Sequence, residues 1–215
     1  MTTSWRWALG IVLVSLTSTW AAGPEYKLAD ATVVTPSDAP HIVQIAASEL
    51  RGYIYRLTET WTASAAEAPK GKPAIVLRTG PGGKLPTSGP DPLQNFALYV
   101  EDGRQIVHGA SGRSTLWAAY QLIESWGVGF YLGGDAVPPA RRDLKVPLVE
   151  HTGVPVFTVR GNLPWFNFLN SPTTWNPQDY KTFFAQMAKQ KANIINFHAY
   201  DHEPFCGYDI TDTTV

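Results

Sequence analysis

The chain has 215 residues, of which 44% are hydrophobic and 16% charged, so it is a globular protein with apolar material for one or two cores. Its 17 basic and 18 acidic residues give a net charge of -1, and no basic run alternates with aromatic residues. This balance argues against a nucleic-acid partner and favours a neutral substrate. Cys206 is the only cysteine, which excludes an intrachain disulfide, and no Cys–His pattern around it predicts a catalytic thiol.

The first 23 residues have the order of a secretory signal peptide. Arg6 precedes an apolar run at residues 8–16, and the small residues Ala21, Ala22 and Gly23 follow. The run is too short to span a membrane unless it stays uncleaved as an anchor. Pro24 argues against the alternative of a buried helix. We therefore predict a signal peptide at 1–23, export to the periplasm or the extracellular space, and no membrane span in the mature chain.

Residues 24–150 have the pattern of a non-catalytic α+β domain. An alternating segment at 27–35 predicts a strand, and the residues 37–40 supply a cap and a proline for a helix that ends near Thr58. The inward face of this helix follows from helical spacing and comprises Ile42, Ala46, Leu50, Tyr53, Ile54 and Leu57. A further strand is predicted at 74–78.

A hairpin and a second helix complete this predicted domain. Strands at 96–100 and 104–108 flank Glu101-Asp102-Gly103, which is typical of a tight antiparallel turn. A helix from Ser114 to about Trp126 ends at Gly127, and a strand at 128–132 closes the domain. The order predicts a mostly antiparallel sheet with two helices on one face, followed by a proline-rich linker at 133–155.

Residues 151–215 predict the first β-α-β of a (β/α)₈ barrel. A strand at 156–160, a helix at 177–191 capped by Asn176, and a strand at 194–198 form a crossover, so the strands should be parallel. Such a barrel typically needs about 250 residues, and the predicted barrel is therefore truncated. We expect this open unit to expose four apolar residues: Phe183, Phe184, Ile194 and Ile195.

Candidate substrate-binding residues lie at the C-terminal ends of the two predicted strands, where barrel enzymes bind substrates. Arg160 and His198 end adjacent strands, and Asp201 follows closely. Arg160 could bind sugar hydroxyls or a carboxylate, and the alternative is a structural ion pair with Asp201. Trp165 heads a group of loop aromatics suited to stacking on sugars or, alternatively, to packing under the loop; the others are Phe166, Phe168 and Trp175.

No motif predicts a metal or a cofactor. The potential ligands between His198 and Glu203 do not have His-Glu-x-x-His spacing, and no predicted helix carries them. The glycine-rich segments 80–83 and 109–112 match neither a phosphate-binding loop nor a nucleophile elbow. We predict no metal, no cofactor and no nucleotide binding.

Three segments resemble retaining beta-hexosaminidases and alpha-glucuronidases: TLWAAYQLIE at 115–124, WGVGFY at 126–131 and VRG at 159–161. In these enzymes a non-catalytic α+β domain precedes a catalytic (β/α)₈ barrel. The resemblance implies that Arg160 holds the terminal sugar, and that His198 and Asp201 correspond to a His-x-x-Asp segment after the second strand. The hexosaminidase Asp-Glu pair would follow the fourth strand, beyond Val215.

The catalytic residues are therefore unknown. Glycoside hydrolysis needs two carboxyl groups roughly 5 to 9 Å apart, and the spacing of the acids between Asp201 and Asp212 fixes no such pair. We predict the N-terminal part of an exported glycoside hydrolase that acts on a glycan of the hexosaminide or glucuronide class and is inactive as this chain alone. The alternative is a non-catalytic α+β module that binds carbohydrate or protein.

The signal peptide gives a first testable prediction. Cleavage is expected between Ala21 and Pro24, because residues 8–16 supply the apolar core of a signal peptide and residues 21–23 supply the small residues of its cleavage site. N-terminal sequencing of the protein made in its native host checks this. Protein with an intact Met1 in a cytosolic fraction would contradict export.

Overall fold

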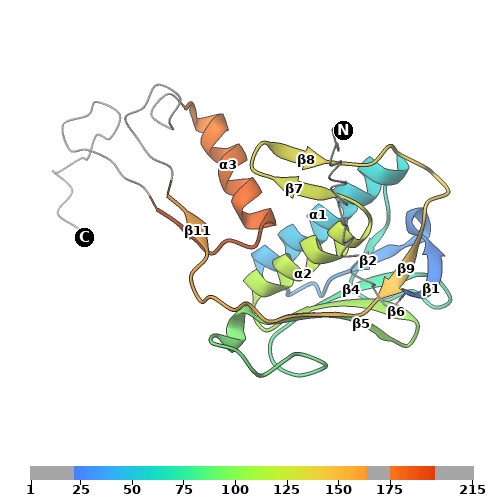
Figure 1. The fold of residues 1–215 in the computed structure, drawn as a ribbon. Helices are drawn as coiled ribbons and strands as arrows, with labels where there is room; N and C mark the ends of the chain where they lie inside the picture. Colours follow the sequence, from blue (N-terminus) through green and yellow to red (C-terminus); the bar gives the residue numbers. More distant parts are fainter. Residues whose placement is uncertain (1–21, 164–174, 197–215) are drawn as a thin grey trace, which may run out of the picture.

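The structure, a computed structural model, describes residues 22–163 and 175–196. A six-stranded sheet forms one layer, and two helices lie side by side across one of its faces (Figure 1). A third helix and a pair of short strands lie beside these helices at one end. Mixed sheets with helices segregated to one face define an α+β domain, as predicted.

The main sheet is mixed, and the prediction of a mostly antiparallel sheet is wrong for it. The strands are, in order across the sheet, β10 (His151–Gly153), β5 (Phe96–Glu101), β6 (Arg104–Gly109), β4 (Ala74–Thr79), β2 (Thr32–Val34) and β3 (Ser64–Ala65). The first two neighbouring pairs are antiparallel and the other three are parallel. The first helix crosses over between β2 and its neighbours β3 and β4, and such a crossover returns the chain in the same direction.

The predicted hairpin between β5 and β6 is confirmed. Glu101 pairs with Arg104, so the turn has two central residues, Asp102 and Gly103. Both have positive φ, 49° and 72°, which is the conformation of a type I′ turn. Its twist matches that of the strands, so this short segment sets the register of the sheet centre.

The two helices of the domain are α1 (His41–Thr58) and α2 (Gly112–Ser125), close to their predicted bounds. The predicted cap of α1 is absent: Pro40 occupies the N-cap position without a side-chain hydrogen bond. In α2 the Ser111 side chain accepts a hydrogen bond from the Ser114 amide and completes a capping box. The core between helices and sheet includes the fully buried Leu50, Ile54, Leu57, Trp117, Leu122 and Ile123.

The predicted linker at 133–155 is instead part of the folded domain. It contains β8 (Gly134–Ala136), which pairs with β7 (Gly129–Tyr131), and β9 (Lys145–Val149), which pairs with β1 (Ala22–Lys27). Pro147 is tolerated in β9 because β9 has one partner strand, β1, among the described residues. The predicted strand at 27–35 is divided into β1 and β2 by a short 3₁₀ turn, Leu28–Asp30.

The last described segments form one parallel β-α-β unit, hereafter the C-terminal unit: β11 (Gly161–Asn162), α3 (Pro177–Lys189) and β12 (Ile194–Ile195). The crossover prediction is confirmed for this unit, and a barrel beyond it stays a prediction. The predicted strand at 156–160 is wrong, because pairing begins only at Gly161. The apolar residues before β11 pair with no described strand and are exposed; Val156, for example, is 78% exposed. Residues 197–198 of the second predicted strand lie outside the described ranges.

The helix of the C-terminal unit packs against the rest of the protein. It contacts α2 and β7, and Phe183 and Met187 are buried there. The expectation that Phe183 is exposed is wrong, and Phe184, Ile194 and Ile195 are half-buried. Asn176 caps α3 as predicted, through hydrogen bonds from the amides of Gln178 and Asp179. No helix within 22–163 and 175–196 is long and apolar enough to cross a membrane.

The close approach of β6 to α2 gives a prediction about stability. A Cβ at Gly109 would lie 2.0 Å from the Thr115 nitrogen and 2.4 Å from the Ser114 carbonyl carbon, both in the backbone of α2. We expect Gly109→Ala to lower the free energy of unfolding by about 3 kcal/mol, the upper end of overpacking effects. Gly52→Ala is the matched control, because a Cβ in this part of α1 meets no atom within 4 Å.

Chemical denaturation of both variants checks this expectation. Gly52→Ala should be neutral or stabilise the protein by up to about 1 kcal/mol, since alanine is the better helix residue. Equal stability of the two variants would contradict the packing of β6 against α2.

Candidate functional site

Of the predicted binding residues at the two strand ends, the structure describes only Arg160. His198, Asp201 and Trp165 lie outside the described ranges, so their predicted contacts with substrate stay predictions. Arg160 lies immediately before β11, at the junction of the C-terminal unit with the α+β domain. The region around this junction is the candidate functional site.

The backbone of Arg160 is fixed by Asn193, which immediately precedes β12. The Arg160 amide donates to Asn193 Oδ1 at 2.8 Å, and the Arg160 carbonyl accepts from the amides of Asn193 and Ile194 at 2.8 and 3.2 Å. Asn193 Nδ2 also donates to the Thr158 carbonyl at 2.6 Å. These bonds extend the short β11–β12 ladder and set the direction of the Arg160 side chain.

The Arg160 guanidinium points toward the α+β domain. It lies 4.8 Å from the centre of the buried Trp117 ring on α2, a cation–π distance. Nη1 donates to Gln94 Oε1 at 2.7 Å and to the Phe157 carbonyl at 2.6 Å, and Nε donates to the Lys191 carbonyl at 3.1 Å. The side chain therefore connects the two parts of the protein.

One end of this guanidinium has no partner among the described residues. Arg160 Nη2 is buried without a hydrogen bond, and no described carboxylate forms an ion pair with it. Burial, and then the charge of Arg113, lower the pKa of Arg160, although an arginine stays protonated in a protein. A partly buried cation that lacks a counter-ion among the described residues favours an incoming acceptor. Both predicted partners, a sugar and Asp201, have oxygen atoms that can accept a hydrogen bond from Arg160.

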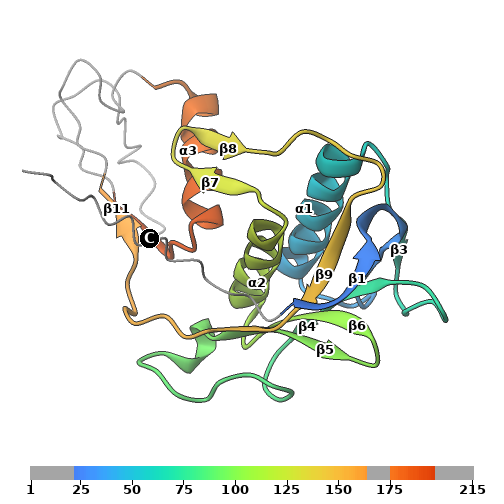
Figure 2. The same ribbon diagram turned by 45° about the vertical axis from the view of Figure 1, so that its right-hand side comes forward.

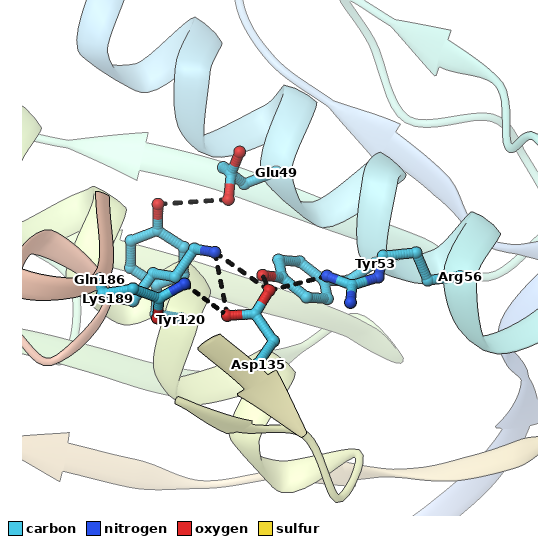
Figure 3. Close-up of polar contacts among 7 residues, drawn as sticks. All are labelled: Glu49, Tyr53, Arg56, Tyr120, Asp135, Gln186 and Lys189. Carbon is cyan, nitrogen blue, oxygen red and sulfur yellow. Dashed lines mark hydrogen bonds and ion pairs between the residues drawn. The ribbon is translucent and has the colours of Figure 1, made fainter. Parts of the chain in front are cut away.

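A second polar cluster joins the C-terminal unit to the α+β domain around Asp135 on β8 (Figure 3). The Asp135 side chain is only 8% exposed. It accepts four donors: Tyr53 Oη at 2.5 Å and Arg56 Nη1 at 2.7 Å from α1, and Gln186 Nε2 and Lys189 Nζ, each at 3.0 Å, from α3. We call these five residues the Asp135 cluster.

The pKa values in the Asp135 cluster follow from this arrangement. Burial alone would raise the pKa of Asp135, but the hydrogen bonds from its four donors outweigh burial and hold the pKa well below its usual range. Burial, and then the hydrogen bond to Asp135, raise the pKa of Tyr53 well above its ordinary value. Asp135 is therefore an anion at neutral pH, and Tyr53 keeps its proton there. Such a carboxylate orients cations and does not donate protons.

Trp175, one of the predicted sugar-stacking aromatics, packs against α3. Its ring centre lies 5.4 Å from that of Tyr180 and 5.2 Å from that of Phe183, which supports the packing alternative for this residue. It also lines an open pocket of about 630 Å³ with Asp179, Thr182, Phe183 and residues of the β7–β8 turn. The pocket lies at the N-terminal half of α3.

Sequence reasoning identified Arg160 but missed its partners and the whole Asp135 cluster. Asp135 fell in the predicted linker, and its contacts to α1 span about eighty residues, so no local spacing indicates them. Gln94 carried no motif. No cluster of three or more potential metal ligands occurs among the described residues, and the segment from His198 to Glu203 lies outside them.

No protein-family model matches the chain, and no curated protein matches it in sequence. Solved structures do resemble it. A family GH115 4-O-methyl-alpha-glucuronidase with specificity for decorated arabinogalactans aligns with a TM-score of 0.59 and 15% identity, over 77% of this chain and 24% of its own. The Streptomyces plicatus N-acetyl-beta-hexosaminidase gives 0.55 and 12%, over 84% and 32%.

A third structure, a GH138 enzyme targeting pectin rhamnogalacturonan II, aligns with a TM-score of 0.54 and 12% identity, over 78% of this chain and 18% of its own. The chain therefore spans a third or less of the length of these structures. At such identities the likeness shows the fold alone. The fold is one that occurs in glycoside hydrolases, which confirms the fold part of the predicted resemblance.

The Asp135 cluster gives a prediction about stability and pH. Asp135→Asn should lower the free energy of unfolding by about 3 kcal/mol, the low end for breaking a buried ion pair, because Arg56 is half-exposed. Asp143→Asn is the matched control, since Asp143 is exposed, and should stay within about 0.5 kcal/mol of the unsubstituted protein. Urea denaturation measures both.

The pH dependence has a definite sign. Because the folded-state pKa of Asp135 is depressed, its contribution is complete above the ordinary aspartate pKa of about 3.9 and is lost as the pH falls below that value. The stability difference between Asp135→Asn and the unsubstituted protein should therefore shrink in acid. A difference that stays constant from about pH 6 to about pH 3 would show that Asp135 is not held as an anion.

Proposed function

We propose that this chain supplies the non-catalytic α+β domain and the first β-α-β of the barrel of an exported glycoside hydrolase that acts on hexosaminides or glucuronides. The observation that carries the proposal is the likeness to glycoside hydrolases across both parts of the chain. The likeness to the N-acetyl-beta-hexosaminidase covers 84% of the chain, more than residues 1–163 could supply. It therefore includes residues of the C-terminal segment as well as the α+β domain.

The chemistry of the α+β domain supports a non-catalytic role for it. A glycosidase needs a carboxylic acid that is protonated at working pH to protonate the leaving group. Asp135, the buried carboxylate of the junction, has a depressed pKa and four donors, so it carries no such proton. In the proposed enzyme, the acid and its partner carboxylate belong to the barrel.

The α+β domain instead gives the start of the barrel a fixed position. Three contacts attach the C-terminal unit: Arg160 on Trp117, Lys189 on Asp135, and an ion pair at 2.7 Å between Lys191 and Glu124 of α2. All three involve half-buried or buried groups, which solvent screens weakly. In the proposed enzyme, this attachment orients the strand end that carries Arg160.

The proposal is tested on the full-length product of the native gene. It should hydrolyse an aryl N-acetylhexosaminide or an aryl glucuronide. The Asp135→Asn variant should lose this activity only at temperatures at which it unfolds, because Asp135 stabilises the fold and takes no part in the reaction. A full-length product that hydrolyses neither substrate, yet binds glycan, would instead support the alternative, a carbohydrate-binding module.

The 215-residue chain alone gives a further prediction. It should show no turnover of either substrate, because positioning residues cannot replace proton transfer and a second carboxylate. N-acetylglucosamine should still bind weakly at Arg160, through charged hydrogen bonds worth about 1.5 to 3 kcal/mol. The indole N–H resonance of Trp117, which lies under Arg160, reports this binding by NMR.

The response of Trp117 should be lost in Arg160→Ala and retained in Glu203→Ala. Arg113→Ala is the matched control, because Arg113 also lies over Trp117, at 5.9 Å, but is exposed. Thermal unfolding of each variant separates lost binding from lost structure. Robust hydrolysis by the purified chain, abolished by Glu203→Ala, would place the catalytic carboxylates in the segment 201–212.

A further inference from the structure

An exposed tryptophan follows the end of α1. Trp61 is 63% exposed, whereas Trp117 and Trp126 are buried at 1% and 7%. It lies in the short connection between α1 and β3, at the edge of the main sheet. An exposed tryptophan offers a large flat apolar surface on which a ligand can stack.

The backbone turn at the end of α1 sets the position of this ring. Glu59, the C-cap residue, has φ of 55°, and its amide donates to the Tyr55 carbonyl at 2.7 Å. This left-handed residue reverses the chain, so that Trp61 folds back onto the last turns of the helix. The position of the Trp61 ring therefore depends on the local sequence between Tyr55 and Trp61.

Tyr55 holds one face of the Trp61 ring. The two ring centres are 4.6 Å apart and the planes differ by 15°, so the rings are stacked. Because Tyr55 covers one face, the exposed 63% of Trp61 must include the opposite face. A ring held in this way loses little conformational entropy when a ligand stacks on it. Flat aromatic faces suit the apolar face of a pyranose ring.

Arg51 supplies a charged group beside the stack. Its guanidinium carbon lies 6.0 Å from the Trp61 ring centre, and its Nε donates to the Thr62 carbonyl at 3.3 Å. Its two terminal nitrogens have no partner in the described part of the chain. An arginine fork of this kind matches a carboxylate with two parallel hydrogen bonds.

A polar pocket adjoins this arginine. It has a volume of about 270 Å³, close to the lower limit for small-molecule sites, and Arg51 forms part of its wall. Thr35 Oγ1 in the same wall is buried and has no hydrogen-bond partner. The other polar side chains of the wall belong to Ser37, Gln44, Ser48 and Ser64.

We propose that Trp61, Tyr55, Arg51 and this pocket form a surface site, the Trp61 site, for a glycan that carries a uronic acid. The free face of Trp61 stacks on the pyranose ring, the Arg51 fork binds the carboxylate, and the hydroxyls of the pocket bind those of the sugar. The nearby acidic residue Glu59 is paired with Arg142 at 3.4 Å, which offsets its repulsion of an anionic ligand.

The Trp61 site is separate from the junction. Figure 2 shows β3, which follows Trp61, at the edge of the molecule opposite β11. A glycan bound there lies far from Arg160 and undergoes no reaction. The site therefore retains polymeric substrate near the protein, and it does so whether or not a catalytic barrel follows.

Two sugars that differ only in the carboxylate test the site: methyl β-D-glucuronide and methyl β-D-glucoside. In titrations of the 215-residue chain followed by the Trp61 indole N–H resonance, the glucuronide should bind about tenfold more tightly, as expected for one charge-assisted pair. Arg51→Gln should abolish this preference. Tyr131→Ala should leave both affinities unchanged, because Tyr131 is equally exposed, at 63%, but lines no pocket among those described.

Trp61→Ala separates this site from the junction. Ligand-observed NMR should show glucuronide affinity at least about tenfold weaker, with loss of the stacked ring. The response of the Trp117 resonance to N-acetylglucosamine should stay unchanged, so failure of one site does not imply failure of the other. Equal binding of the two sugars, an unshifted Trp61 resonance, or full glucuronide affinity in Trp61→Ala would overturn the proposal.

Discussion

The position of the C-terminal unit depends on one buried carboxylate. Arg56 on α1 and Lys189 on α3 are both cations, and without an anion between them they would repel each other. Asp135 accepts hydrogen bonds from both, so the same charges hold the helices together. The β7–β8 hairpin places this residue, which explains why a short hairpin outside the main sheet matters to the arrangement.

Arg160 attaches the C-terminal unit at a second point. Its cation lies on the Trp117 ring, and its hydrogen bonds reach Gln94 in the α+β domain and Lys191 in the C-terminal unit. In the proposed enzyme, a residue that binds sugar also couples the domain to the barrel. Substitution of Arg160 then affects stability and binding together, and only a site-specific resonance distinguishes the two effects.

The sequence indicates most of what is local in this fold. The helices follow from apolar spacing, and the central hairpin follows from Asp102-Gly103, because each depends on residues a few positions apart. Pairings between distant segments were missed: β9 returns to β1, and β10 joins β5, from a stretch whose prolines indicate a loop. Arg160 was identified as a site residue from its local position at a predicted strand end. Its contacts to Trp117 and Gln94 were missed, because they join segments far apart in the sequence.

The pairing of β1 with β9 has a consequence for the order of folding. The first described strand, Ala22–Lys27, has its ladder partner in Lys145–Val149, more than a hundred residues later. The β1–β9 ladder therefore cannot form until nearly all of the α+β domain has been synthesised. Because a pairing between segments so far apart in the sequence has a high loop-closure cost, we expect this ladder to form after the two helices and the β5–β6 hairpin.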